Sequence, residues 1–283
     1  MTSFGSEIAA AFFSTAASML LLWIAARRRF FVGWRGVQEP VAPPTLLLVL
    51  GAFALYFLIG NAIPHLISKR ISILVSNNLI ELAALVNFFT GCAILIALLF
   101  YNRIIYRPIA QSMWSRSSKR DLKSDASFAI MACLISFPLV ICVGQILEII
   151  VYLFFNTLQL PDQNVIAFLK STFQTPLYFF VATFSIIIFA PLIEEMLFRG
   201  FIQSYLRKYF NAPIAIALSS AAFSFFHFTK DQGLGNIPII GSLFILANFL
   251  GFIYERQGSL YSPIILHATF NALSIANLYF LGI

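Results

Sequence analysis

The sequence predicts an all-α protein, a polytopic transmembrane bundle of about eight helices. Of the 283 residues, 60% are hydrophobic and only 10% are charged, whereas soluble domains are about 45–50% apolar and roughly 25% charged. The apolar residues also gather in runs of the length that a membrane helix needs, about 20 residues. These observations exclude a soluble globular protein, a disordered chain and a nucleic-acid binder of the usual polar kind.

The apolar runs predict the helices in order. The first run, residues 8–26, is followed directly by Arg27, Arg28 and Arg29. A signal peptide carries its positive charge before the apolar stretch, so this run predicts a membrane helix with its N-terminus outside. The other predicted helices cover residues 45–67, 79–101, 126–155, 176–206, 212–228, 237–254 and 260–281. The fifth is long enough to continue beyond the membrane core as one helix.

The basic residues predict the orientation of these helices. With the N-terminus outside, the inside loops carry 14 of the 18 Lys and Arg residues, and the outside loops carry four. The positive-inside rule then predicts a multi-pass protein of the plasma membrane with both termini outside. The basic loop 102–125 ends an N-terminal part, residues 1–125, and a C-terminal catalytic domain follows at 126–283. We expect the lipid bilayer as a partner, and no nucleic acid.

Three cysteines and Glu148 also lie inside the predicted spans, and the sequence indicates their roles less specifically. Cys92, Cys133 and Cys142 all lie in apolar runs, and their odd number without a CxxC pair argues against a disulfide framework. We expect them to be packing residues. Glu148 lies in the fourth run, about one helical turn after Gln145. The sequence leaves open whether these two line a cavity or form a buried hydrogen-bonded pair.

Two adjacent carboxylates, Glu194 and Glu195, lie in the fifth apolar run. Charged side chains cost about 2.5–3.5 kcal/mol at the bilayer centre, so they are functional candidates. Glu195 and Arg199 are four residues apart and share a helix face, which predicts a structural ion pair. Glu194 then points about 100° away. Pro191 is expected to free the carbonyl of Ile187 and to kink the helix just before the carboxylates.

Two histidines lie in later apolar runs, each in a four-residue spacing that puts two side chains on one helix face. Phe223 precedes His227 and can pack beneath its ring, while His267 precedes Asn271. His267 and Asn271 can both donate hydrogen bonds to one spot. If the fifth and sixth runs form a hairpin with its turn at position 211, Glu194 is 17 residues before the turn and His227 is 16 after it. The two then lie at nearly the same level.

These motifs, in this order on separate helices, resemble the CPBP family of intramembrane proteases. The family includes type II CAAX prenyl endopeptidases and bacterial proteins linked to bacteriocin processing or self-immunity. The resemblance covers roughly residues 176–281 and implies an active site inside the C-terminal helices. It implies an intramembrane endopeptidase that acts on membrane-associated or lipidated peptides, with CAAX-type C-terminal processing as one form of this activity.

By this resemblance, Glu194 is the main catalytic residue, His227 is its partner, and His267 and Asn271 complete the site. Glu195, Arg199 and Phe223 are expected to support it structurally. Amide hydrolysis needs a base for water and donors for the oxyanion. A metal-free reading has Glu194 and His227 activating water while His267 and Asn271 stabilise the oxyanion. The family was long described as metalloproteases, and Glu194, His227 and His267 could bind zinc with an open position. The sequence leaves both readings open and assigns no cofactor.

Other function classes fit the sequence less well. The HExxH motif of zincins and the GxSxG motif of serine hydrolases are both absent. A proton-coupled transporter would use Glu and His residues as a relay, but neither a repeat nor a pair of broken helices is evident. A membrane scaffold or immunity protein with a dispensable protease site is the third class. Only an enzyme loses cleavage and keeps its fold after Glu194→Gln.

Overall fold

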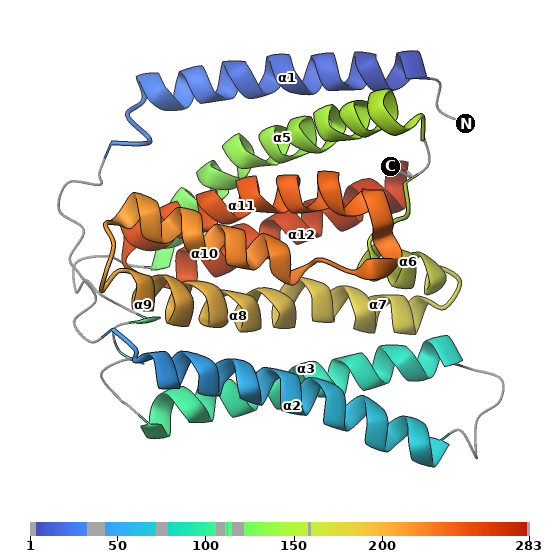
Figure 1. Cartoon of the computed structure of the whole chain (residues 1–283), viewed down its shortest axis with the longest axis vertical. Coiled ribbons are helices and arrows are strands. Elements are labelled where there is room, and N and C mark those ends of the chain that lie inside the picture. The colour runs from blue at the N-terminus through green and yellow to red at the C-terminus, as the bar shows by residue number, and fades with distance from the viewer. Residues whose placement is uncertain are drawn as a thin grey trace.

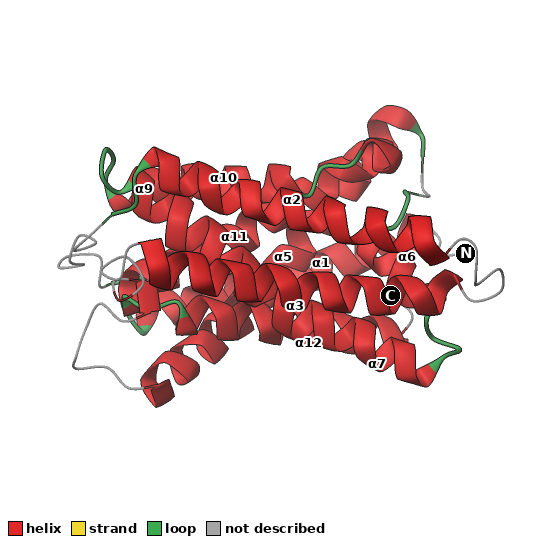
Figure 2. Ribbon diagram, turned by 90° about the horizontal axis from the view of Figure 1, so that it is seen from below, coloured by secondary structure: helices red, strands yellow, loops and turns green. Residues whose placement is uncertain are grey.

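The structure is a computed structural model that describes residues 4–32, 43–71, 79–105, 111, 113–114, 122–157 and 160–281. These residues form helices and no strand (Figure 2). Six of the described helices are long and apolar enough to cross a membrane. The predicted all-α membrane bundle is therefore confirmed.

All eight predicted runs are helical. The first four correspond to α1 (Phe4–Arg27), α2 (Leu46–Ile71), α3 (Leu79–Ile105) and α5 (Leu122–Phe155). The fifth is one nearly continuous helix of α7 (Pro176–Phe184), η1 (Ser185–Phe189), α8 (Ala190–Glu195), η2 (Met196–Gln203) and α9 (Ser204–Leu206). The last three are α10 (Ala212–Phe226), α11 (Asn236–Gln257) and α12 (Tyr261–Leu281). Two short helices lie between them, α6 (Asn164–Ser171) and the 3₁₀ helix η3 (Lys230–Gly235).

The ends of the C-terminal helices follow from local sequence. Pro176 occupies the first turn of α7, where its missing N–H costs nothing. The side chain of Asn211 caps α10 by accepting a hydrogen bond of 3.2 Å from the Ile214 N–H. Gly258 ends α11 in the left-handed conformation, with φ of 65°, which glycine adopts without strain. These signals place the two tight connections in the C-terminal half of the chain.

The sixth predicted helix is shorter than the sequence suggested. α10 has 15 residues and ends at Phe226, so at about 1.5 Å per residue it covers roughly 22 Å of a hydrocarbon core of about 30 Å. The chain then continues as a short non-helical segment, enters η3 and begins α11 (Figure 1). The predicted run 212–228 is therefore not a full span, and His227 lies just past the end of the helix.

The helices stack in layers (Figure 1). α1 covers one face of the bundle and packs on α5, which also packs on α11 and α12. α2 and α3 pair on the opposite face, against the long helix from α7 to α9. The first three predicted helices thus lie on two opposite sides of the C-terminal helices. Most of the predicted basic loop 102–125 lies outside the described residues.

A buried core joins the fifth helix to α10 and α11. Phe198, Phe201, Phe223 and Tyr254 are all essentially inaccessible and pack in one cluster. Close approach is possible because Gly251 has no side chain, and a Cβ there would lie 2.7 Å from Gln203 Oε1. The three cysteines are free thiols. Cys133 is buried in an apolar cluster, as the sequence suggested, and Cys142 is buried with its Sγ 3.2 Å from Thr15 Oγ1.

Candidate active site

The helix that carries the two glutamates changes its winding on both sides of them. α8 lies between η1 and η2, which are π-helical. In η1 the N–H of Ala190 bonds to the carbonyl of Ser185, five residues back. The next carbonyl, that of Ile186, would need an N–H from residue 191, which is proline. With this winding the carbonyl of Ile186 has no backbone donor, one residue before the Ile187 carbonyl that α-helical winding predicts.

Asn271 on α12 takes up this free carbonyl. Its Nδ2 donates a hydrogen bond of 2.9 Å to the oxygen of Ile186. A buried carbonyl without a partner costs free energy comparable to a lost hydrogen bond, so this contact stabilises the irregular winding. It also ties α12 to the fifth helix, and it leaves the second N–H of the Asn271 amide for another acceptor.

Glu195 and Arg199 form the ion pair that the spacing predicted. Arg199 Nη1 lies 3.1 Å from Glu195 Oε1, and both side chains are fully buried. Arg199 Nη2 donates to the carbonyl of Ala247 on α11 at 3.0 Å. The guanidinium carbon also lies 4.7 Å from the centre of the Phe223 ring on α10, within cation–π range. Arg199 therefore holds three helices together around the site.

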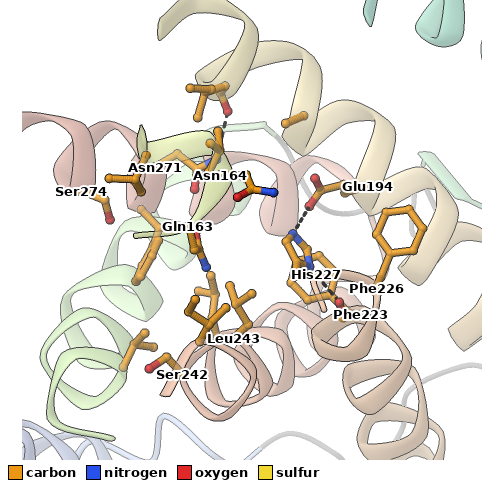
Figure 3. A pocket seen from close by; sticks show the side chains of 18 of the residues that line it. Gln163, Asn164, Glu194, Phe223, Phe226, His227, Ser242, Leu243, Asn271 and Ser274 are labelled. Carbon is orange, nitrogen blue, oxygen red and sulfur yellow. Dashed lines mark hydrogen bonds and ion pairs between the residues drawn. The ribbon is translucent and has the colours of Figure 1, made fainter. Parts of the chain in front are cut away.

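Glu194 points away from this pair, toward both histidines. Its Oε2 lies 3.9 Å from His227 Nε2 and 3.8 Å from His267 Nε2. The side chains of Glu194 and His227 are 17% and 28% exposed, which leaves room for a small molecule beside them. Figure 3 shows Glu194 and His227 facing one another. The structure thus brings together three residues from α8, from the C-terminal end of α10 and from α12.

The other nitrogen of each histidine ring is held by an acceptor. His227 Nδ1 lies 2.9 Å from the carbonyl oxygen of Phe223, whose ring packs against the imidazole at a centroid distance of 4.9 Å. His267 Nδ1 lies 2.9 Å from Glu195 Oε1. A carbonyl oxygen and an ion-paired carboxylate accept hydrogen bonds, so both Nδ1 atoms carry hydrogen. The Nε2 atoms are therefore the ones presented to Glu194.

His267 and Asn271 share a face of α12 as predicted, but each already makes one hydrogen bond. His267 bonds to Glu195 through Nδ1, and Asn271 bonds to Ile186 through one of its two N–H groups. The sequence predicted that both residues are free to donate hydrogen bonds, but in the structure each has one of its polar groups already bonded. What remains for a ligand is His267 Nε2 and the second N–H of Asn271.

The four predicted site residues line one cavity of about 590 Å³. Its walls come from α5, α6, the fifth helix, α11, α12 and the segment that follows α10, and most of them are apolar. Tyr56 of α2 and Phe226 of α10 also line it. Figure 3 shows Glu194 and His227 on its wall, and His267 lines it too.

Sequence reasoning missed part of this wall. Gln163 and Asn164, at the start of α6, reach into the cavity (Figure 3), and Thr229 and Gln232 line it from the segment between α10 and α11. These polar residues belong to connections without a motif. The one sequence feature that they share is their position between two predicted spans.

The structure also separates Glu148 from Gln145. Gln145 Oε1 accepts a hydrogen bond of 2.7 Å from Ser14 on α1, while Glu148 lines the cavity. Of the two readings that the sequence left open, the cavity reading applies to Glu148. Glu255, near the end of α11, is buried and pairs with Arg207 at 3.4 Å.

The donor chemistry resembles that of a zinc site. Both imidazoles bond through Nδ1 and present Nε2, as zinc-ligating histidines do. Within the described part of the chain, however, no group of three His, Cys, Asp or Glu side chains has the spacing of a metal site. Glu194, His227 and His267 are the residues that would hold zinc, which would make bound water more acidic. The spacing does not fit, so the steps below use side chains alone.

Comparison with known proteins adds one finding. Residues 176–273 match the family model described as type II CAAX prenyl endopeptidase Rce1-like. No curated protein and no solved structure matches the chain. The matched range runs from the first residue of α7 into α12 and contains all four residues of the candidate site. Over this stretch, about a third of the chain, the sequence is similar to type II CAAX prenyl endopeptidases of the Rce1-like family.

Proposed function

We propose that the chain is an intramembrane endopeptidase that hydrolyses peptide bonds of membrane-associated substrates, and that Glu194 and His227 activate the attacking water. The observation that carries the proposal is the position of Glu194 Oε2, 3.9 Å from His227 Nε2 and 3.8 Å from His267 Nε2, on the wall of a cavity of about 590 Å³. CAAX-type C-terminal processing is one activity that the family match suggests.

The gap between Glu194 and His227 accounts for the first step. At 3.9 Å the two groups are too far apart for a direct hydrogen bond. A water between them donates one hydrogen to the carboxylate and the other to His227 Nε2. Glu194 then accepts a proton as the water oxygen attacks the carbonyl carbon of the substrate. Because Nδ1 of His227 is fixed on the Phe223 carbonyl, the ring is already oriented for this contact.

Two groups on α12 stabilise the oxyanion. The second N–H of Asn271 is one donor, and the Ile186 carbonyl holds the amide in place. His267 is the other, and it donates through Nε2 when both of its ring nitrogens carry hydrogen. The carboxylate of Glu195 on Nδ1 fixes the orientation of the ring.

Collapse of the tetrahedral intermediate completes the reaction. The bond between carbon and nitrogen breaks, and the leaving amine takes the proton that Glu194 accepted. The products are a carboxylic acid and an amine, which exchange a proton and become a carboxylate and an ammonium group, so atoms and charge balance. Glu195 and Arg199 take no proton in these steps. Their role is to position His267 and to hold the helices.

A comparison of membrane peptides tests the function. New peptide termini are compared by mass spectrometry in membranes that contain the wild-type protein or Glu194→Gln at equal abundance. We expect new termini that are present only with the wild type. Identical sets of termini in the two membranes would show that the chain is not a protease under those conditions, and would favour the scaffold or transporter classes.

We also propose that the protein lies in the plasma membrane with both termini outside. The division of Lys and Arg between alternate loops supports this orientation, at 13 to 4 once the buried Arg199 is left out. The two ends of the described chain lie at the same end of the bundle (Figure 1), as an even number of crossings requires. Cysteine labels at both termini and in the loop 102–125 test it. Reaction of that loop with an impermeant reagent from outside would reverse the orientation.

A further inference from the structure

A tyrosine of α2 forms part of the cavity wall near the candidate active site. Tyr56 lines the same cavity as Glu194 and His227, although α2 lies outside the range that matches the family model. α2 packs against η2, which follows the two glutamates, while α12 contacts the fifth helix through η1 and α8. In Figure 1, α2 and α12 lie on opposite sides of that helix. Tyr56 is therefore the wall residue that the α2 side supplies among the described residues.

The ring of Tyr56 is held at the Glu194 end of the cavity. Its centroid lies 5.4 Å from that of Phe226, and the Phe226 ring lies 6.1 Å from that of His227. Figure 3 shows Phe226 and Glu194 toward one end of the cavity and Asn271 toward the other. The phenol of Tyr56 is also close enough to Glu194 to interact with the charge of its carboxylate.

The hydroxyl of Tyr56 is available to a ligand. No described residue forms a hydrogen bond with it, and its oxygen is not enclosed by the described chain. The hydroxyl of Tyr101 on α3, by contrast, donates to the Leu48 carbonyl at 3.1 Å. A tyrosine that is partly buried normally finds a hydrogen-bond partner for its hydroxyl. A substrate in the cavity can supply this partner.

The proposed reaction leaves one polar group of the cleaved bond without a contact. Asn271 and His267 on α12 bind the oxyanion, and Glu194 returns its proton to the lone pair of the leaving nitrogen. The remaining group is the N–H of that nitrogen, which needs an acceptor. The nitrogen becomes positively charged as it takes up the proton. Tyr56 is at the Glu194 end, away from the oxyanion donors, and a phenol oxygen can accept a hydrogen bond.

We infer that Tyr56 is a further catalytic residue, whose oxygen accepts a hydrogen bond from the N–H of the leaving amine. The inference rests on the proposed protease function and assigns the leaving-group side of its site to α2. In this step the bond between carbon and nitrogen breaks, the proton comes from Glu194, and Tyr56 keeps its own hydrogen. The hydrogen bond strengthens as the nitrogen becomes charged, so it contributes to kcat more than to binding.

Tyr56→Phe and a pair of matched substrates test this inference. One substrate is a peptide whose cleavage site has been mapped, and the other has an ester in place of the amide at that bond. The ester has no N–H, so the proposed hydrogen bond cannot form with it. Tyr56→Phe is expected to lower kcat for the peptide by about 10–100-fold, the usual effect of a hydrogen bond to a charged group. For the ester, kcat is expected to stay within about twofold, because the contact is already absent.

Tyr101→Phe is the matched control. It removes a hydroxyl that bonds within the bundle, and Tyr101 does not line the cavity. Its unfolding midpoint is expected to fall by about 2–4 °C, with kcat unchanged for both substrates. Tyr56→Phe keeps the ring contacts with Phe226 and Phe57, so its midpoint is expected to stay within about 2 °C of the wild type.

The two substrates separate this inference from the protease function. Equal losses on the peptide and the ester would make Tyr56 a structural residue and overturn the inference. Unchanged cleavage of the peptide by Tyr56→Phe would overturn it too. In both cases, peptide cleavage by the wild type that is lost in Glu194→Gln leaves the protease function intact. A wild-type protein that cleaves neither substrate would contradict the protease function, and the inference with it.

Discussion

Arg199→Ala is expected to destabilise the fold more than any change at the catalytic carboxylate. Arg199 and Glu195 are both fully buried, and their ion pair is 3.1 Å long. Removal of one partner leaves a buried charge uncompensated, which costs about 3–5 kcal/mol. The same change removes the hydrogen bond to Ala247 and the stacking on Phe223. At about 2–4 °C per kcal/mol for a chain of somewhat smaller size, the midpoint of thermal unfolding falls by about 10 °C.

The assay is thermal unfolding of purified protein in detergent, with two companion variants. Arg199→Lys keeps the charge and loses the planar fork, so its midpoint lies between those of the wild type and Arg199→Ala. Glu194→Gln is nearly isosteric and faces the cavity, so its midpoint stays within about 2 °C of the wild type. If Arg199→Ala and Glu194→Gln unfold at the same temperature, the division between a structural and a chemical carboxylate is wrong.

Three further predictions concern the chemistry. His227→Gln is expected to lower kcat by about 10²–10⁴, the usual contribution of a proton-transfer partner, with an unchanged unfolding midpoint; a loss below about tenfold would remove His227 from the water-activating pair. Asn271→Ala is expected to lower kcat by about 10²–10³ and also the unfolding midpoint, because the Ile186 carbonyl loses its donor; an effect on stability alone would make Asn271 a positioning residue. Metal analysis of active protein is expected to find no stoichiometric zinc, and zinc whose removal and return switch cleavage off and on would replace the proposed water activation by a metal-based one.

Periodicity and charge predicted most of the architecture, because each span must bury about 20 apolar residues whatever its neighbours are. They did not predict how the spans are arranged. α1 packs on α5, while α2 and α3 lie on the opposite face. Such contacts depend on side-chain packing between surfaces that are apolar all round, and hydrophobicity alone does not distinguish these surfaces.

The site was predictable where one helix face decides the geometry. The four-residue spacing of Glu195 and Arg199 predicted their ion pair, and that of Phe223 and His227 predicted the ring contact. The hydrogen bond of His267 to Glu195 was not predictable, because it depends on how α12 crosses the fifth helix.

The π-helical segments were likewise outside the reach of the sequence. Pro191 removes a donor under any winding, but which carbonyl it frees depends on whether the turn closes four or five residues back. The early end of α10 was hidden by Phe228, which continues the apolar run past the last helical residue, Phe226. The cavity depends on that early end, so its polar wall could not be assigned before the structure.

Hydrolysis by the purified protein in water enriched in the heavy oxygen isotope tests the central claim most directly. Wild-type protein and Glu194→Gln, reconstituted in liposomes, are given a library of internally quenched peptides for a single turnover. The account predicts cleavage by the wild type alone, with heavy oxygen in the new C-terminal carboxylate from the first turnover, because water is the nucleophile. Equal cleavage by Glu194→Gln, or first-turnover products without heavy oxygen, would contradict the role of Glu194 as the base that activates water.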